Sequence, residues 1–184
     1  MSSRTYYKSR ILTLKVDEVL LKGRKMKRAV VVHPGSVAIV PFIDKSHILL
    51  IKQYRHPINR TLLEIPAGTL EEGEAPLVCA RRELREETGY RARSMHEIGS
   101  LYLAPGYSSE LIHVFLASGL EYAGQKTEPD EGIDVEVRDV HEALREIRAR
   151  RFRCDAKTVC GLFYASMYLG KSITTFRSPL SKPD

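Results

Sequence analysis

Residues 80–90 read "ARRELREETGY", and this stretch decides how the rest of the chain is interpreted. Its glutamates Glu83, Glu86 and Glu87 are three and four residues apart, so on a helix they would lie close together and repel one another. The arrangement therefore requires a positive partner. One interpretation is a solvated acidic face that the neighbouring arginines partly neutralise, and the other is a bound divalent cation.

The same stretch has helix signals at both ends. Pro76 suits the first turn of a helix and Gly89 suits a left-handed stop, so the sequence predicts a helix from near Ala75 to Gly89. With about 100° between successive residues, the glutamates fall on one side of this helix. The opposite, packing side is predicted to consist of Leu77, Ala80, Leu84 and Thr88.

Length and composition restrict the class of protein. The chain has 184 residues, enough for one well-buried domain and too few for two of ordinary size. Hydrophobic residues make up 43% and charged residues 28%, as in globular proteins. No apolar run approaches the ~20 residues of a membrane span, and residues 1–10 lack the apolar core of a signal peptide. We therefore expect a cytoplasmic protein without a membrane partner, whose three cysteines are free thiols.

The net charge of +6 is concentrated near the N-terminus, because residues 1–28 contain nine Lys or Arg and only two acids. Residues 22–24 form a predicted turn between two β-rich runs, 11–21 and 26–32. Such a basic hairpin could contact nucleic acid or a phosphate-bearing substrate, or it could simply be solvated. No recognisable nucleic-acid-binding module accompanies it, so we do not expect nucleic acid as a partner.

Short runs rich in Val, Ile and Leu, separated by turn residues, predict buried strands after the hairpin. These runs are residues 36–42, 47–55, 62–65, 97–103, 111–117 and 133–137. Helical spacing occurs at residues 140–152 and 156–169, in addition to the glutamate-rich helix. Strands and helices that mix without a steady βα alternation indicate an α+β domain with a layered mixed sheet, and not a doubly wound fold.

The region before the helix completes a longer pattern. Gly68 is followed after five residues by Glu74, and Glu74 after seven residues by the run from Arg82 to Gly89. This pattern resembles the Nudix box, G-x5-E-x7-R-E-U-x-E-E-x-G-U with U a bulky apolar residue, at every fixed position. A chance match to so many single-residue requirements is expected on the order of once in a million sequences. The resemblance implies a Nudix-type α/β/α sandwich with a mixed β-sheet, plus an N-terminal β-hairpin segment.

The resemblance also implies a metal site on the helix. In the family pattern Glu83 and Glu87 bind the metal directly, Glu86 assists, and the backbone carbonyl of Ala67 is a further ligand. Mg²⁺ prefers such oxygen ligands and keeps several waters, so it is the expected cofactor, with Mn²⁺ as the alternative. The structural positions of the box are Gly68, Glu74, Arg82 and Gly89, with Arg82 and Glu74 expected to pair and hold the loop against the helix.

Three flanking features are similar to those of the ADP-ribose pyrophosphatase group of this family. Pro105 lies sixteen residues after Gly89, residues 52–68 read "KQYRHPINRTLLEIPAG", and residues 155–158 read "DAKT". Each also has a plain structural interpretation, as a turn, a pairing of Arg55 across strands, and a surface lysine. Their joint occurrence favours the group, in which the N-terminal β segment exchanges contacts across a homodimer.

The resemblance to this group implies a set of substrate-binding residues: Arg55, Glu64, Pro105, Gly106 and Glu110. The chain departs from the group at residues 108–110, which read "SSE" where S-D-E is often found. One carboxylate expected near the terminal ribose is therefore absent, although Glu110 is present.

The general base need not come from the box, because glutamates that coordinate a cation have low basicity. The group places a catalytic glutamate on a loop between the last strands, which corresponds here to residues 126–137. This alignment assigns Glu131 as the base, with Glu128 as the alternative in another register. A solvated acidic loop without a catalytic role is also open, and the base would then lie in the box, where Glu86 is the candidate.

Together these features predict a Mg²⁺-dependent homodimeric hydrolase that converts ADP-ribose to AMP and ribose 5-phosphate. The alternatives are another nucleoside diphosphate sugar as substrate, such as GDP-mannose, or a non-catalytic Nudix-like regulatory domain. The expected organisation is a dimer-exchanged β segment (1–33), a catalytic domain (34–170) and a loosely ordered tail (171–184).

Overall fold

The computed structural model describes residues 2–125 and 132–170, which form three β-sheets and three α-helices. The strands are β1 (Ser3–Lys8), β2 (Thr13–Leu21), β3 (Arg24–Val32), β4 (Ser36–Pro41), β5 (His47–Arg55), β6 (Arg60–Glu64), β7 (Ala67–Thr69), β8 (Tyr90–Tyr102), β9 (Leu111–Tyr122) and β10 (Asp134–Asp139). The helices are the short 3-10 helix η1 (His56–Ile58) and the α-helices α1 (Pro76–Thr88), α2 (Val140–Arg148) and α3 (Ala156–Tyr168).

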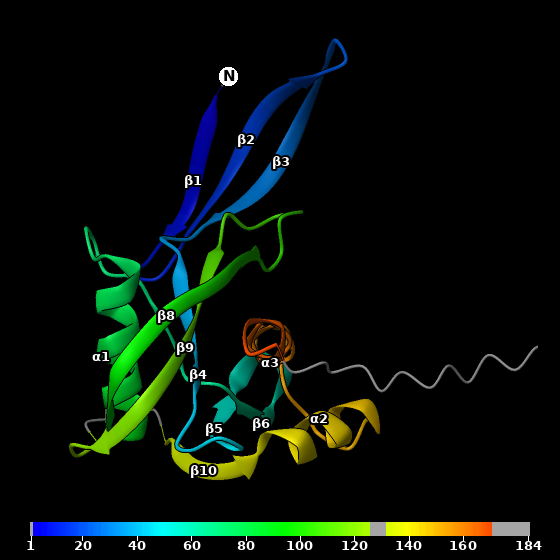
Figure 1. Ribbon diagram of the computed structural model, residues 1–184. Coiled ribbons are helices and arrows are strands. Elements are labelled where there is room, and N and C mark those ends of the chain that lie inside the picture. The colour runs from blue at the N-terminus through cyan, green and yellow to red at the C-terminus, as the bar shows by residue number, and fades with distance from the viewer. Residues whose placement is uncertain (1, 126–131, 171–184) are drawn as a thin grey trace, which may run out of the picture.

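The central sheet has the strand order β7-β4-β9-β8, in which β4 and β9 are parallel and the other pairs are antiparallel. Side chains of a strand alternate between two faces, so β4 contributes to two separate cores. Val37 and Ile39 pack in the cluster that includes α1, whereas Ala38 and Val40 pack in the cluster that includes Leu162 of α3. The helices α1 and α3 therefore cover opposite faces of this sheet, as an α/β/α sandwich (Figure 1).

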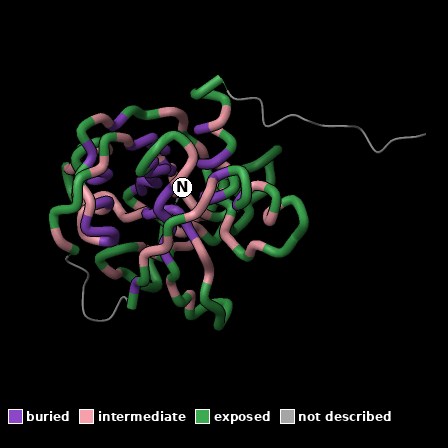
Figure 2. Tube along the Cα trace, turned by 60° about the horizontal axis from the view of Figure 1, so that its bottom comes forward, coloured by how far each residue is buried: buried purple, intermediate pink, exposed green. Residues whose placement is uncertain are grey.

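The second sheet has the order β10-β5-β6, and its middle strand β5 is fully buried at residues 48–51. The helix α2 follows β10 directly and begins at a capping residue, Asp139, whose side chain accepts a hydrogen bond from the Glu142 N–H at 2.9 Å. Figure 2 shows that the buried residues are concentrated in the body formed by these two sheets and their helices.

The N-terminal sheet, β1-β2-β3, stands away from this body (Figure 1). β2 and β3 form the predicted hairpin, with Lys22 and Gly23 in its turn at φ angles of 49° and 75°. The base of the hairpin is tied to the body, where the Val31 N–H donates to the Tyr107 carbonyl at 2.7 Å. Apolar surface remains uncovered on the sheet, since Tyr6 and Tyr7 are each 59% exposed.

The predicted fold class, an α/β/α sandwich with a mixed sheet and an N-terminal hairpin, is confirmed. Two strands, β1 and β7, have no counterpart among the predicted elements, because "SRTYYK" and "AGT" lack an alternating apolar pattern. The tail at 171–184 lies outside the described residues.

Candidate active site

The glutamate-rich helix α1 begins at Pro76, and Gly89 follows its end in the left-handed conformation at φ 79°. Both boundaries agree with the prediction. Cys79, Ala80 and Leu84 turn inward and fix the helix on the central sheet. Leu77, which was predicted on the packing side, is 41% exposed; that prediction was wrong because the core cluster takes its first side chain of the helix from Cys79.

Arg82 lies at the centre of the acidic residues of the box. Its guanidinium donates to Glu74 through Nε at 3.0 Å and through Nη2 at 2.9 Å. Its Nη1 donates to Glu83 at 2.6 Å and to Glu86 at 3.1 Å. One guanidinium thus binds three carboxylates, which offsets the repulsion among neighbouring glutamates on the helix. The predicted pairing of Arg82 with Glu74 is present.

This pairing keeps both partners charged at neutral pH. The hydrogen bonds from Arg82 lower the pKa of Glu74 to about 2, and the same bonds raise the pKa of Arg82 above its ordinary value. The Glu71 N–H also donates to Glu74, at 3.0 Å. The loop between β7 and α1 is therefore anchored to the helix.

The strand β7 brings its backbone directly against the glutamates of α1. The Ala67 N–H donates to Oε2 of Glu87 at 2.9 Å. A Cβ added to the next residue, Gly68, would lie 1.9 Å from Cδ of Glu83, so the glycine leaves the space that this carboxylate fills. Glu87 is only 4% exposed. Its side chain turns toward β7, and it still lines the same cavity as Glu83.

The donor atoms at this edge of the sheet suit a hard divalent cation. The three box glutamates and the carbonyl of Ala67 supply oxygen, which Mg²⁺ and Mn²⁺ accept. Among the described residues no three His, Cys, Asp or Glu side chains converge on one point as a complete metal cage. Mg²⁺ favours an arrangement in which few protein oxygens hold the cation and water and substrate phosphates complete its coordination. The residues present therefore fit a Mg²⁺ ion.

A cavity of about 760 Å³ lies against these glutamates. The helix α1 contributes Glu83 and Glu87 to its lining, and β5 contributes Gln53 and Arg55. The side-chain oxygen of Gln53 is buried without a hydrogen-bond partner in the described part of the chain, so the cavity offers a ligand an acceptor. Residues 8–11, from the end of β1 into the turn before β2, also line it.

Lys8 and Arg10, in that segment, bring positive charge to the same cavity as the glutamates. The sequence shows that the N-terminus is basic but does not indicate what it contacts. No local signal predicts that this turn and β7 line one cavity, because the residues of β7 are about sixty positions further along the chain.

Arg55 is held in the cavity by a buried ion-pair network. Glu64 has no exposed surface and accepts hydrogen bonds from Arg55, at 2.9 Å from Nε and 2.6 Å from Nη2. Lys157, 7% exposed, donates to the same carboxylate. Burial alone would raise the pKa of Glu64, but the hydrogen bonds and charges of Arg55 and Lys157 outweigh it and keep that pKa well below its usual range. Glu64 is thus placed to orient Arg55 and has no surface with which to contact a ligand.

The "DAKT" segment has a structural role in this network. Asp155 is the capping residue of α3 and accepts hydrogen bonds from the N–H and the Oγ1 of Thr158, at 3.0 and 2.7 Å. Asp155 also accepts from Lys157. The Thr158 Oγ1 in turn accepts from the Ile65 N–H at 3.0 Å, just before β7. Lys157 is therefore a buried ion-pair partner, and the interpretation as a surface lysine is excluded.

The remaining predicted residues lie elsewhere or outside the described part of the chain. Pro105 and Gly106 line a separate groove of about 490 Å³ beside β2 and β3. Glu110 accepts a hydrogen bond from the Ser36 hydroxyl at 2.8 Å. Glu128 and Glu131, the predicted bases, lie outside the described residues.

The three-layer sandwich thus presents its glutamate-bearing helix to a cavity edged with Lys and Arg. The chain belongs to the NUDIX domain family, whose model matches residues 32–157. It is therefore a Nudix hydrolase, as the box predicted. In the described residues, no helix combines the length and apolar character that spanning a membrane would require.

Individual known proteins are similar over most of the chain. An ADP-ribose pyrophosphatase of Bacillus subtilis (strain 168) is 43% identical over 166 residues, which cover 89% of this chain and 87% of that protein. A methanol dehydrogenase activator of Bacillus methanolicus is 38% identical over 164 residues and 88% of each chain. The crystal structure of an ADP compounds hydrolase superposes with a TM-score of 0.77 over 92% of each chain at 22% identity, which supports the fold.

Proposed function

We propose that this Nudix hydrolase splits the diphosphate bond of ADP-ribose, giving AMP and ribose 5-phosphate. The observation that carries the proposal is one cavity lined by both the Glu83 and Glu87 carboxylates and the Arg55 guanidinium. Carboxylates suit a cation that binds phosphate oxygens, and a guanidinium binds the same oxygens through paired hydrogen bonds. The 43% identity to a protein named ADP-ribose pyrophosphatase favours this substrate over GDP-mannose.

The proposed ligands of Mg²⁺, or of Mn²⁺ in its place, are Glu83, Glu87 and the carbonyl of Ala67, with Glu86 assisting. When bound, the cation would position the attacking water and neutralise charge that develops on the phosphate. The chain prepares these ligands by hydrogen bonds of its own. Arg82 binds Glu83, which lines the cavity, and also Glu86, and the Ala67 N–H fixes the orientation of Glu87.

Arg55 is the proposed anchor of the substrate diphosphate. Glu64 occupies its Nε and Nη2, and this pairing fixes the guanidinium plane so that the remaining donors can serve a ligand. Lys8 and Arg10 add positive charge to the same cavity. Glu110 remains a proposed contact to the terminal ribose, and Pro105 and Gly106 remain proposed substrate contacts although they line the separate groove beside β2 and β3.

The proposed general base is Glu131, with Glu128 and then Glu86 as the alternatives. A base other than the metal-binding glutamates is favoured because a carboxylate that coordinates a cation has lost most of its basicity. The water activated by such a base would attack one phosphorus of the diphosphate. The bond from that phosphorus to the bridging oxygen would break, which releases AMP and ribose 5-phosphate.

We also infer a homodimer in which residues 1–33 contact the partner subunit and residues 34–170 form the catalytic domain. The support is the apolar surface of a sheet that stands away from the body, where Leu20 is 62% exposed in addition to Tyr6 and Tyr7. Deletion of residues 1–28 should then shift the mass measured by light scattering toward the monomer. A truncated chain that stays dimeric would show that the segment is not exchanged.

The free thiols in the described part suit a cytoplasmic location, which we propose for the protein.

Incubation with a panel of substrates tests the activity. ADP-ribose, GDP-mannose, NADH and 8-oxo-dGTP are each incubated with the full-length protein and Mg²⁺ or Mn²⁺, and products are identified by mass. A parallel reaction in ¹⁸O-labelled water should place one label in a phosphate-bearing product, as attack on phosphorus requires. Label in no product, or cleavage only of the other substrates, would contradict the proposal.

A further inference from the structure

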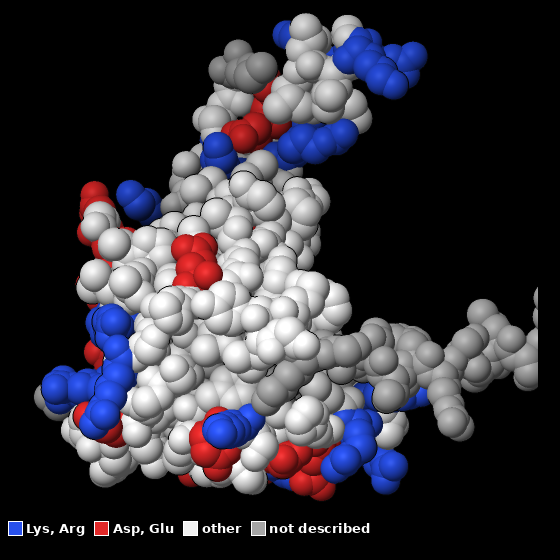
Figure 3. Space-filling model, in the orientation of Figure 1, with Lys and Arg blue, Asp and Glu red and all other residues white. Residues whose placement is uncertain are grey.

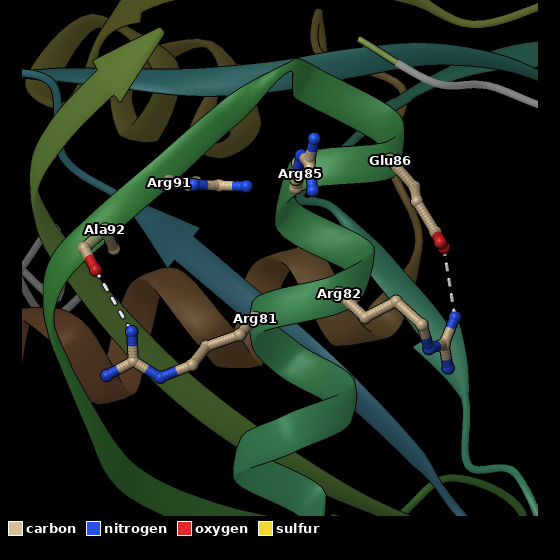
Figure 4. Close-up of a pocket in the computed structure, with 6 residues that line it drawn as sticks. All are labelled: Arg81, Arg82, Arg85, Glu86, Arg91 and Ala92. Carbon is tan, nitrogen blue, oxygen red and sulfur yellow. Dashed lines mark hydrogen bonds and ion pairs between the residues drawn. The ribbon is translucent and has the colours of Figure 1, made fainter. Parts of the chain in front are cut away.

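A second cavity, of about 490 Å³, lies between α1 and the start of β8. Its lining consists of Arg81, Arg82, Arg85, Glu86, Arg91 and Ala92 (Figure 4). Four of these six residues are arginines and one is acidic. On the molecular surface, Lys and Arg side chains gather over the region where α1 and the start of β8 lie (Figure 3). The proposed hydrolysis uses neither Arg85 nor Arg91.

The acidic residue of this cavity does not neutralise its arginines. Glu86 turns toward Arg82, with which it pairs at 3.1 Å, and away from the space beside Arg85 (Figure 4). Arg81 donates to the backbone carbonyl of Ala92 at 3.1 Å, which binds the guanidinium without cancelling its charge. Within residues 2–125 and 132–170, no carboxylate forms an ion pair with Arg81, Arg85 or Arg91.

Arg85 has a donor that requires a partner. Its Nε is buried and has no hydrogen-bond partner among the described residues. A buried donor on a charged group is unfavourable when left unpaired, and native structures rarely retain one without a ligand, ion or water. Arg91 extends from β8 toward the helix at the level of Arg85 (Figure 4). Two like charges therefore face one cavity, and an anion between them would relieve both the repulsion and the unpaired donor.

We propose that this arginine cavity, defined by Arg81, Arg85 and Arg91, binds a phosphate group. The planar, forked guanidinium matches the oxygens of a phosphate, and several of them around one tetrahedral anion give it multiple charge-assisted hydrogen bonds. The charge excludes a cation as ligand, and the volume leaves room for either free phosphate or a phosphate ester. The site is separate from the catalytic cavity but shares one lining residue with it, Arg82.

Calorimetric titration of inorganic phosphate into the full-length, metal-free protein tests this site. Wild type should bind phosphate saturably, and the double variant Arg85→Gln, Arg91→Gln should bind it at least about tenfold more weakly, since two charge-assisted contacts are lost. Arg93→Gln is the matched control, because Arg93 is on the same strand but pairs with Glu121 and does not line the cavity. Its affinity for phosphate should equal that of wild type.

The catalytic cavity is the competing location for phosphate, and Arg55→Gln distinguishes the two. Binding that persists in Arg55→Gln and weakens in the double variant supports the arginine cavity. Binding abolished by Arg55→Gln, unchanged in the double variant, or absent from wild type would overturn the proposal. If the double variant has a lower melting temperature than wild type, Arg91→Gln alone replaces it in this test, because Arg91 is exposed.

A titration with AMP distinguishes the two sources of the phosphate group. AMP that binds more tightly than phosphate, and loses affinity in the double variant, identifies a phosphate ester. AMP that binds no more tightly identifies free phosphate. Neither titration requires turnover, so their outcome is independent of whether ADP-ribose is hydrolysed.

Discussion

Glu64 has no exposed surface, yet its carboxylate binds Arg55 through two hydrogen bonds of 2.6 and 2.9 Å, and Arg55 lines the catalytic cavity. A buried carboxylate, Glu64, thus sets the position of Arg55 at the catalytic cavity. Lys157 completes the network from α3, so the last helix is linked to the cavity by charge as well as by packing.

Removal of the Glu64 charge should unfold the protein more easily. Glu64→Gln leaves Arg55 without its carboxylate and the buried Lys157 with Asp155 as its remaining anion, so we expect a loss of about 3 kcal/mol in the free energy of unfolding. Glu121→Gln is the control, because Glu121 pairs with Arg93 at the surface and its loss should cost about 1 kcal/mol or less. Urea denaturation measures both, and equal losses would contradict the role given to Glu64.

Glu87→Gln should separate catalysis from folding. The amide oxygen can still accept the hydrogen bond from the Ala67 N–H, whereas the charge proposed to bind the metal is lost. We expect activity to fall by orders of magnitude while the melting temperature changes little. Activity close to wild type at saturating Mg²⁺ would remove Glu87 from the metal site.

Two glycine variants should differ in what they lose: one should lose activity and the other stability. Gly68→Ala places a Cβ on the Glu83 carboxylate, which can swing aside, so activity should fall about 10–100-fold with the fold retained. Gly161→Ala places a Cβ 2.6 Å from Cδ1 of Ile65 in the core, so it should cost about 1–3 kcal/mol of stability with activity largely kept. Steady-state kinetics and thermal melts on both variants distinguish these outcomes. Loss of stability in Gly68→Ala without loss of activity would contradict the account.

The sequence predicted the elements that have strong local signals. The helix α1 could be placed because Pro76 and Gly89 mark its ends, and the box fixed which glutamates to examine. The burial of Glu87 could not be predicted, since periodicity gives the side of a helix but not the short strand β7 that covers it. The cavities that Lys8 and Arg85 line could not be predicted for a related reason: these cavities are formed by segments distant in the chain or by like charges that only the fold brings together.

The contribution of the Glu74–Arg82 ion pair to the free energy of unfolding should depend on pH. The pKa of Glu74 is about 2 in the folded protein, against an ordinary value of 4.5. A carboxylate whose pKa is lowered by folding stabilises the folded protein at pH values above its unfolded pKa. This contribution is lost as the pH falls toward the folded pKa. The difference in unfolding free energy between wild type and Glu74→Gln should therefore be constant from about pH 7 to 5 and shrink below about pH 4.5. Denaturation at a series of pH values measures it, and a difference as large at about pH 2–3 as at pH 7 would refute the pairing.

Glu131→Gln should lower kcat by roughly two to four decades, the range for loss of a positioned base, with little change in substrate affinity. If Glu128→Gln is inactive and Glu131→Gln turns over normally, the base is still on this loop but is Glu128, and the alignment register changes accordingly. If both variants turn over normally, the base lies in the box, with Glu86 as the candidate.

The ratio of kcat/KM for ADP-ribose to that for GDP-mannose, measured with Mg²⁺ and with products identified by mass, shows which substrate the cavity fits. We expect AMP and ribose 5-phosphate as the products and a ratio of at least about ten, the discrimination expected from a site fitted to one of two similar ligands. No turnover of ADP-ribose, or a ratio below one, would contradict it.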